Sequence, residues 1–145
     1  MLRQPVTVIL AWSVLFVLLN NSLIFSQSNW PRFRGPNGAG LVEGADLPED
    51  ISDAEYHWKV KLAGVGSSSP VIWDQYLFVT SCDPSSGKLT LECLDVLSGK
   101  VRWSKIFQHE VYRVHGRNNF ASSTPAVDKN HIYLIVQVRL GFLVL

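Results

Sequence analysis

The sequence predicts an all-β fold built from repeated sheets, and three observations support this prediction. Short segments rich in Val, Ile, Leu and aromatic residues follow one another from residue 56 onward, separated by Pro, Gly, Asp and Ser. No stretch after residue 28 has the 3.6-residue spacing of apolar side chains that marks an amphipathic helix. A segment that starts at Ser69 recurs without gaps at Thr124, 55 residues later.

Residues 1–28 are expected to be a signal peptide. Arg3 precedes an apolar run from Val6 to Leu19, and Ser26 or Ser28 provides a small residue for cleavage. The run is shorter than the ~20 apolar residues that span a bilayer, so an uncleaved membrane anchor is the alternative. The sequence therefore predicts an exported chain that works in the periplasm or outside the cell, with membrane contact only through an uncleaved signal segment.

The remainder of the chain is close to electrically neutral. The sequence has 13 basic and 12 acidic residues, of which only Arg3 lies in the first 28 residues. A neutral chain without a basic cluster lacks the phosphate attraction that dominates nucleic-acid binding. No nucleic-acid partner is therefore expected.

Residues 29–55 are expected to form an irregular leader, and residues 56–145 a β domain. The leader is rich in Gly, Pro and acidic residues and has the periodicity of neither a strand nor a helix. Its glycines follow no strand and precede no helix, so they do not predict a phosphate-binding loop. The β domain begins with five expected strands, which are Tyr56–Leu62, Ser69–Trp73, Tyr76–Ser81, Leu89–Val96 and Val101–Phe107.

Turn residues connect these strands and keep the two cysteines apart. With a turn at Asp83–Lys88, Cys82 pairs with Leu89, and Cys93 lies about four residues further along the ladder. That separation exceeds the reach of a disulfide, so two buried free thiols are expected. The other expected turns are Asp74-Gln75 and Leu97–Lys100.

The internal repeat aligns Ser69–Val79 with Thr124–Leu134 at a constant offset. Repeats of four short antiparallel strands are typical of β-propeller blades. The offset of 55 residues exceeds the usual ~40–50 residues of a blade, and a long loop at Gln108–Phe120 accounts for the excess. A β-sandwich with two similar hairpins is the alternative.

The segment Cys93–Trp103 carries a specific resemblance. Its sequence resembles the docking motif of propeller blades of the pyrroloquinoline-quinone (PQQ) type, Ala-x-Asp-x-x-Thr-Gly-x-x-x-Trp. Asp95, Gly99 and Trp103 match this motif, and Ser98 stands in for Thr. The resemblance implies that Asp95, Ser98 and Gly99 shape a turn and that Trp103 lies flat between neighbouring blades. These four residues are therefore expected to dock blades, a structural role that does not imply quinone binding.

Two further segments extend the resemblance. Trp30–Gly38 is similar to the opening of a group of secreted bacterial propellers of this type, and Ala121–Pro125 is similar to the start of their second blade. In that group, Tyr56–Leu62 would supply the outer strand of the last blade. After Ile135 no second docking motif follows. The expected product is an incomplete propeller with about one complete four-stranded blade and the start of a second, from a truncated reading frame.

The leading functional prediction is a non-catalytic scaffold that binds a protein or ligand. The sequence shows no recognisable catalytic or metal-binding constellation. Loops at the mouth of a propeller are frequent binding sites, so a protein partner is expected there. The most polar loop contains His109, Glu110, His115, Arg117, Asn118 and Asn119, and it is expected to be solvated.

Two alternatives remain open. One is a truncated PQQ-dependent dehydrogenase, which by family analogy would bind PQQ and calcium. The sequence lacks the adjacent Cys-Cys pair that the analogy implies, and it offers no assignable base or calcium ligand. The other alternative is a truncated gene product without a function.

Overall fold

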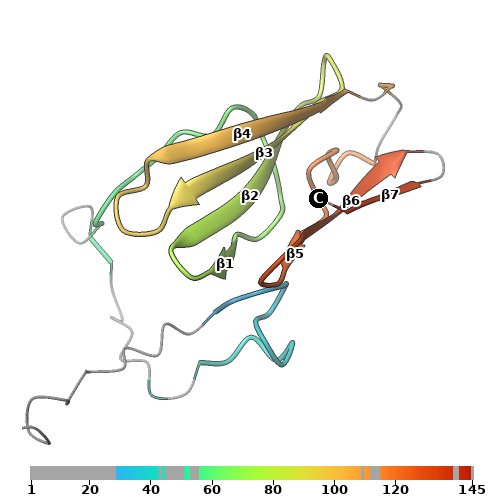
Figure 1. Cartoon of the computed structure of the whole chain (residues 1–145). Coiled ribbons are helices and arrows are strands. Elements are labelled where there is room, and N and C mark those ends of the chain that lie inside the picture. The colour runs from blue at the N-terminus through green and yellow to red at the C-terminus, as the bar shows by residue number, and fades with distance from the viewer. Residues whose placement is uncertain are drawn as a thin grey trace, which may run out of the picture.

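The computed structural model describes residues 29–42, 44, 51–52, 56–108, 110–111, 115–138 and 141–144. Within these residues the all-β prediction is confirmed, because seven strands form two antiparallel sheets and none of the described residues is helical (Figure 1). The expected signal peptide and part of the leader lie outside the described residues.

The first sheet has the strand order β1-β2-β3-β4. Four predicted strands are confirmed to within two residues at each end, since the sheet contains β1 (Val71–Trp73), β2 (Tyr76–Asp83), β3 (Lys88–Asp95) and β4 (Val101–Gln108). The turns also lie where the sequence predicts them. Asp74 in the β1–β2 turn has a φ of 50°, and Gly87 in the β2–β3 turn has a φ of 70°.

The second sheet has the order β5-β6-β7 in the described part of the chain. Its strands are β5 (Ala126–Val127), β6 (Ile132–Val138) and β7 (Gly141–Val144). The internal repeat is confirmed down to strand register. Val71 pairs with Phe78 in the first sheet, and the residues 55 positions later, Ala126 and Tyr133, pair in the second.

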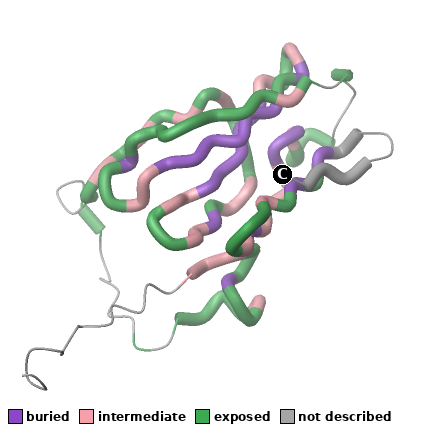
Figure 2. Tube along the Cα trace, viewed as in Figure 1, coloured by how far each residue is buried: buried purple, intermediate pink, exposed green. Residues whose placement is uncertain are grey.

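One face of the first sheet is buried against the second sheet. This face, called here the front face, consists of Val71, Phe78, Cys82, Leu89, Leu91 and Cys93. Its side chains form two apolar clusters with Val127, Leu134 and Val136 of the second sheet. Figure 2 shows the buried residues concentrated along β2 and β3. In β6, Leu134 and Val136 are buried.

The two sheets pack front to back. Val127 and Leu134 of the second sheet are equivalent to Ile72 and Val79 of the first, 55 residues earlier. The side chains of Ile72 and Val79 lie on the back of the first sheet, which is the face opposite to that of Phe78. Alternate side chains of a strand point to opposite faces. The front face of one sheet therefore contacts the back face of the next, as in a stack of equivalent units.

The prediction of a strand at Tyr56–Leu62 is wrong. These residues belong to neither sheet, although Trp58, Val60 and Leu62 are partly buried and the residues between them are exposed. Alternation of apolar side chains is necessary for a half-buried strand, but a strand also needs a neighbour to pair with. After this segment the chain pairs with the first sheet at Val65, which exchanges two backbone hydrogen bonds with Cys82 at 2.9 and 2.7 Å.

The described part of the leader contains no named strand, and it connects the two sheets. The backbone of Trp30 exchanges two hydrogen bonds of 2.9 Å with Ile72 of β1. The next residue, Pro31, accepts a hydrogen bond of 2.8 Å from the N–H of Val127 in β5. The leader, blue in Figure 1, thus covers the free edge of the first strand of each sheet.

The prediction for the cysteines is confirmed. Cys82 pairs with Leu89 and Cys93 pairs with Phe78, so four positions of the β2–β3 ladder separate the two thiols. Both cysteines are buried and free.

Candidate functional site

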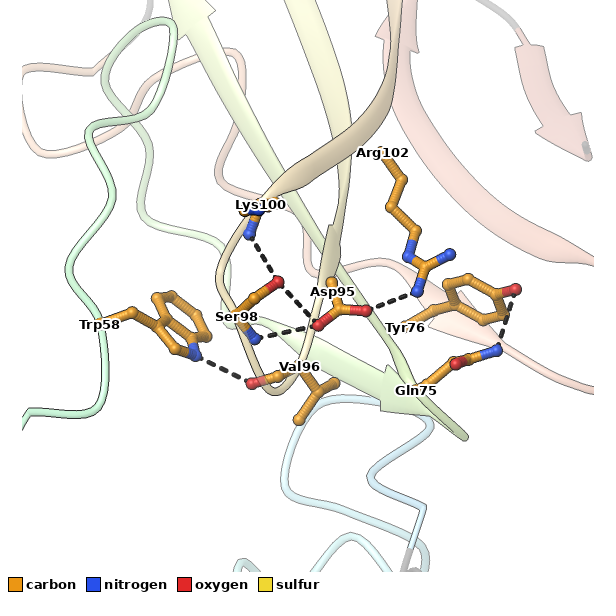
Figure 3. A network of polar contacts seen from close by, with 8 residues as sticks. All are labelled: Trp58, Gln75, Tyr76, Asp95, Val96, Ser98, Lys100 and Arg102. Atoms are coloured by element: carbon orange, nitrogen blue, oxygen red, sulfur yellow. Dashed lines mark hydrogen bonds and ion pairs between the residues drawn. The ribbon is translucent and has the colours of Figure 1, made fainter.

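The turn between β3 and β4 is held by the carboxylate of Asp95 (Figure 3). One carboxylate oxygen accepts hydrogen bonds from the backbone N–H and the hydroxyl of Ser98, at 2.9 and 2.8 Å. The other oxygen accepts a hydrogen bond of 2.5 Å from the guanidinium of Arg102. The backbone adds a bond from the N–H of Gly99 to the C=O of Asp95, at 2.8 Å. Side chains of this kind replace the backbone partners that a tight turn lacks.

These hydrogen bonds favour the ionised form of Asp95. The bonds from Arg102 and then from Ser98 lower the pKa of the carboxyl group from 3.8 to about 2. Arg102 also lies over the ring of Tyr76, 5.2 Å from its centroid, so it joins the turn to β2. The carboxylate is therefore committed to the turn and is not available as a general base near neutral pH.

Gly99 allows an indole to pack directly against the turn. Its φ is +67°, and a Cβ added there would lie 2.5 Å from the indole ring of Trp58. The Trp58 Nε1–H donates a hydrogen bond of 2.8 Å to the C=O of Val96. Glycine is thus required twice, by the backbone conformation and by the close approach of the ring. In Figure 3, Trp58 and Arg102 lie on opposite sides of the turn.

Trp103 lies on the outermost strand of the first sheet, opposite Cys93 of β3. Its ring is 6.0 Å from that of Phe78, between centroids, and its side chain is 41% exposed. The indole therefore extends the front face toward the second sheet without being enclosed. The inter-blade role expected for Trp103 stays a prediction.

A groove of about 820 Å³ separates the outer part of the front face from the β5–β6 turn. Four aromatic residues of the first sheet line it, together with basic side chains and the residues of that turn. The aromatic lining consists of Trp73, Tyr76, Phe78 and Trp103. The groove thus combines large apolar rings with cationic groups at Arg102, Lys105 and Lys129.

The acidic groups of the groove do not fit a calcium-bound quinone. Both oxygens of Asp128 are already in use, because one accepts from the N–H groups of Asn130 and His131, at 2.7 and 2.8 Å, and the other from the Tyr133 hydroxyl at 2.7 Å. Asp74, the other acid lining the groove, also has an interaction. Calcium takes six to eight oxygen ligands, and among the described residues no three His, Cys, Asp or Glu side chains gather as a metal site.

The loop between β4 and β5 is held in place by Asn119. The side-chain amide of Asn119 donates to the Ser67 hydroxyl at 3.0 Å and accepts from the N–H of Ala121 at 2.8 Å. Before it, the C=O of His115 accepts a hydrogen bond of 2.8 Å from Asn118. His115, Arg117 and Asn118 are exposed on this ordered turn. The solvated polar loop that the sequence predicts is confirmed for these residues, whereas His109 lies outside the described ones.

The four predicted docking residues all lie on one hairpin, and Asp95, Ser98 and Gly99 share its turn. Sequence reasoning missed the groups that contact this hairpin from outside its motif. Trp58 was expected in a strand of its own, and its contact with Gly99 joins residues 41 positions apart. The bond from the Ser69 N–H to the Thr124 hydroxyl, 2.9 Å long, was also missed, although the repeat aligns these two residues.

Comparisons of the chain with protein families, curated proteins and solved structures found no match. Among the residues that the structure describes, no helix has the length and apolar character needed to cross a membrane.

Proposed function

We propose that the chain is an exported, non-catalytic scaffold that binds a protein partner, built on a β-propeller of PQQ-like repeats. The docking motif at Cys93–Trp103 and the similar segments at Trp30–Gly38 and Ala121–Pro125 support the family assignment. Two sheets with the same register, packed front to back, are consistent with consecutive blades. Export rests on the apolar run after Arg3.

The ordered loop at residues 115–119 is the observation that carries the binding proposal. Asn119 ties its end to Ser67, while Arg117 and Asn118 remain exposed. A loop held by a rigid scaffold loses little conformational entropy on binding, which is why such loops are frequent interaction sites. Arginine is also enriched at protein interfaces.

The roles of the acidic residues favour a scaffold over an enzyme. Asp83, Asp95 and Asp128 each hold a hairpin turn, through hydrogen bonds with Ser85, Ser98 and Asn130. Their pKa values lie at about 2, far from the value near neutrality that suits a general base.

Site-specific photo-cross-linking in the exporting cell tests the binding proposal. A photoreactive amino acid in place of Asn118 is expected to cross-link one protein of defined mass. The same amino acid in place of Leu97, at the opposite end of β4, serves as the control. Asn119→Ala is expected to reduce the cross-link, because it releases the loop. Equal yields at positions 118 and 97, or no cross-link, would contradict the proposal.

Titration with PQQ and calcium tests the absence of catalysis. The scaffold proposal predicts no saturable change in absorbance and no quinone-dependent reduction of a dye. Saturable binding of PQQ with turnover would contradict the scaffold proposal and favour a quinoprotein dehydrogenase.

Thermal unfolding tests whether the chain is a functional unit at all, since a non-functional truncated product is expected to unfold without cooperativity.

A further inference from the structure

The outer edge of β4 is unpaired among the described residues. β4 is last in the sheet order β1-β2-β3-β4, and Figure 1 shows it along the outside of the first sheet. Seven of its eight residues are exposed, whereas six of the eight residues of β3 are buried. The contact between the two sheets joins a face of each sheet, so it does not use this edge.

The hydrogen-bond pattern of the first sheet identifies the β4 residues that face outward. Cys82 exchanges its backbone hydrogen bonds with Val65, on the side of β2 that faces away from β3. In an antiparallel ladder, two opposite residues either bond to each other or both face away from each other. Leu89, opposite Cys82, therefore directs its N–H and C=O groups to β4, where its partner is Phe107.

Ser104 and Ile106 direct their backbone groups away from the sheet. Bonded pairs recur at every second residue of a ladder, so Lys105 bonds to β3 as Phe107 does, and the residues on either side of Lys105 do not. Within the described part of the chain, no backbone hydrogen bond of Ser104 or Ile106 is found outside the β3–β4 ladder. Two N–H and two C=O groups in this spacing are a template for an added strand.

The two faces of this edge differ in chemistry. Lys105 lies on the front face, and the β4 sequence contains no acidic residue. Arg102 is already paired with Asp95, so Lys105 supplies the main positive charge beside the outward-facing groups. On the back face, Val101 and Ile106 are 49% and 57% exposed. A strand that complements both faces therefore carries acidic residues on one face and apolar residues on the other.

A second copy of this chain does not provide that complement. When two β4 strands pair antiparallel so that Ser104 of each bonds to Ile106 of the other, the two Lys105 side chains lie directly opposite each other. Like charges in this position are destabilising. Lysine at the edge of a sheet opposes pairing between identical edges in general. The charge of the edge thus favours a different, acidic chain.

We propose that the outer edge of β4 binds an extended segment of another protein in which acidic residues alternate with β-branched apolar residues. The segment adds to the first sheet beside β4, and its backbone bonds to that of Ser104 and Ile106. An acidic side chain of the segment pairs with Lys105, and its apolar side chains cover Val101 and Ile106. In this mode of recognition the backbone bonds provide affinity and the side chains provide specificity.

Amide hydrogen exchange of the full chain, measured by NMR, tests the free edge. The amides of Lys105 and Phe107 are expected to exchange slowly, and those of Ser104 and Ile106 rapidly. The probe is a synthetic peptide of about seven residues, blocked at both ends, in which Val and Glu alternate. At saturation this peptide is expected to slow exchange at Ser104 and Ile106. A peptide in which Lys replaces Glu is expected to leave exchange there unchanged.

Two variants test the backbone and the charge separately, with affinities measured by isothermal titration calorimetry. Ser104→Pro removes one outward N–H and leaves the bonds to β3 in place, so it is expected to weaken binding of the Val–Glu peptide about tenfold or more. Lys105→Glu leaves the backbone unchanged. It is expected to weaken binding of the same peptide about tenfold and to strengthen binding of the Val–Lys peptide.

Arg34→Glu is the charge-matched control. Arg34 is exposed in the leader, and the leader pairs with β1 through Trp30, at the opposite edge of the first sheet. This variant is expected to change the affinity for neither peptide. If Ser104→Pro does not fold, the reversal of preference in Lys105→Glu decides between the outcomes.

Three results would overturn the proposal. They are slow exchange of the Ser104 and Ile106 amides in the free chain, equal or absent binding of the two peptides, and an unchanged preference in Lys105→Glu. Protection of the two amides that rises with protein concentration, without peptide, would assign the edge to a second copy instead. Asn119→Ala, which releases the loop at residues 115–119, is expected to leave peptide binding unchanged, so the scaffold function and the strand addition can fail separately.

Discussion

Gly99 is the residue on which the β3–β4 turn depends most strongly. Its positive φ and the ring of Trp58 leave no room for a side chain. Gly99→Ala is expected to lower the free energy of unfolding by about 1–3 kcal/mol, because it strains the backbone and displaces the indole. Urea unfolding followed by tryptophan fluorescence measures this loss.

Gly116→Ala is the control for that substitution. A Cβ at Gly116 meets no atom within 4 Å, and Gly116 is not among the glycines with positive φ. Its free energy of unfolding is expected to change by less than about 0.5 kcal/mol. Equal losses for the two variants would show that the contact between Gly99 and Trp58 does not form.

The turn carboxylates make stability depend on pH in the acid range. Hydrogen bonds, chiefly from Ser85 to Asp83, Arg102 to Asp95 and Tyr133 to Asp128, lower each pKa from 3.8 to about 2. A carboxyl group whose pKa is lower in the folded state stabilises that state fully above its unfolded pKa. This contribution is lost as the pH falls from about 4 to about 2.

Asp95→Asn tests that dependence. The variant is expected to lose less stability than the unsubstituted chain between pH 4 and pH 2, because one of the three titrating groups is absent. Urea unfolding midpoints at several pH values provide the measurement. Identical pH slopes for the two proteins would contradict the hydrogen bonds assigned to Asp95.

At the scale of strands, the β2–β3 register separates the two thiols. Cys82 and Cys93 pair with Leu89 and Phe78, and both are buried. We expect a thiol reagent to modify neither cysteine in the folded protein and both in denaturant. Modification of both is expected without prior reduction. A disulfide detected by mass spectrometry in the native protein would show that the register is wrong.

Strands that pair with their sequence neighbours were predictable. β1 to β4 follow from alternating apolar residues and from Asp, Pro and Gly at the turns. The failure at Tyr56–Leu62 has a physical cause. Its alternation is genuine, but a strand needs a hydrogen-bonding partner, and sequence pattern does not reveal whether that partner is present.

The candidate site was predictable only within its local motif. Asp95, Ser98 and Gly99 act over a few residues, so their spacing indicates their roles. Trp58 contacts Gly99 across 41 residues, and Asn119 reaches Ser67 across 52. Such contacts depend on how the sheets pack. The repeated Trp in Tyr56–Leu62 and Val101–Phe107 was the signal that could have identified Trp58 as a docking residue.

At the scale of the whole molecule, the direction of packing separates the two architectures that the sequence allows. A β-sandwich buries the equivalent faces of two sheets against each other, whereas a propeller places the front of one blade against the back of the next. The apolar clusters join Leu89 and Cys82 to Leu134 and Val136, which is the front-to-back arrangement. The leader and the bond between Ser69 and Thr124 also connect the two sheets.

NOE spectroscopy of methyl and aromatic protons on the chain in solution tests this packing most directly. The front-to-back arrangement predicts NOEs from Leu89 and Leu91 to Leu134, Val136 and Val127, and none from Phe78 to Tyr133 or Ile135 within one chain. Isotope-filtered spectra of mixed labelled and unlabelled chains separate contacts within a chain from those between chains. Intrachain NOEs between Phe78 and Ile135 would contradict the stacked sheets and favour a sandwich.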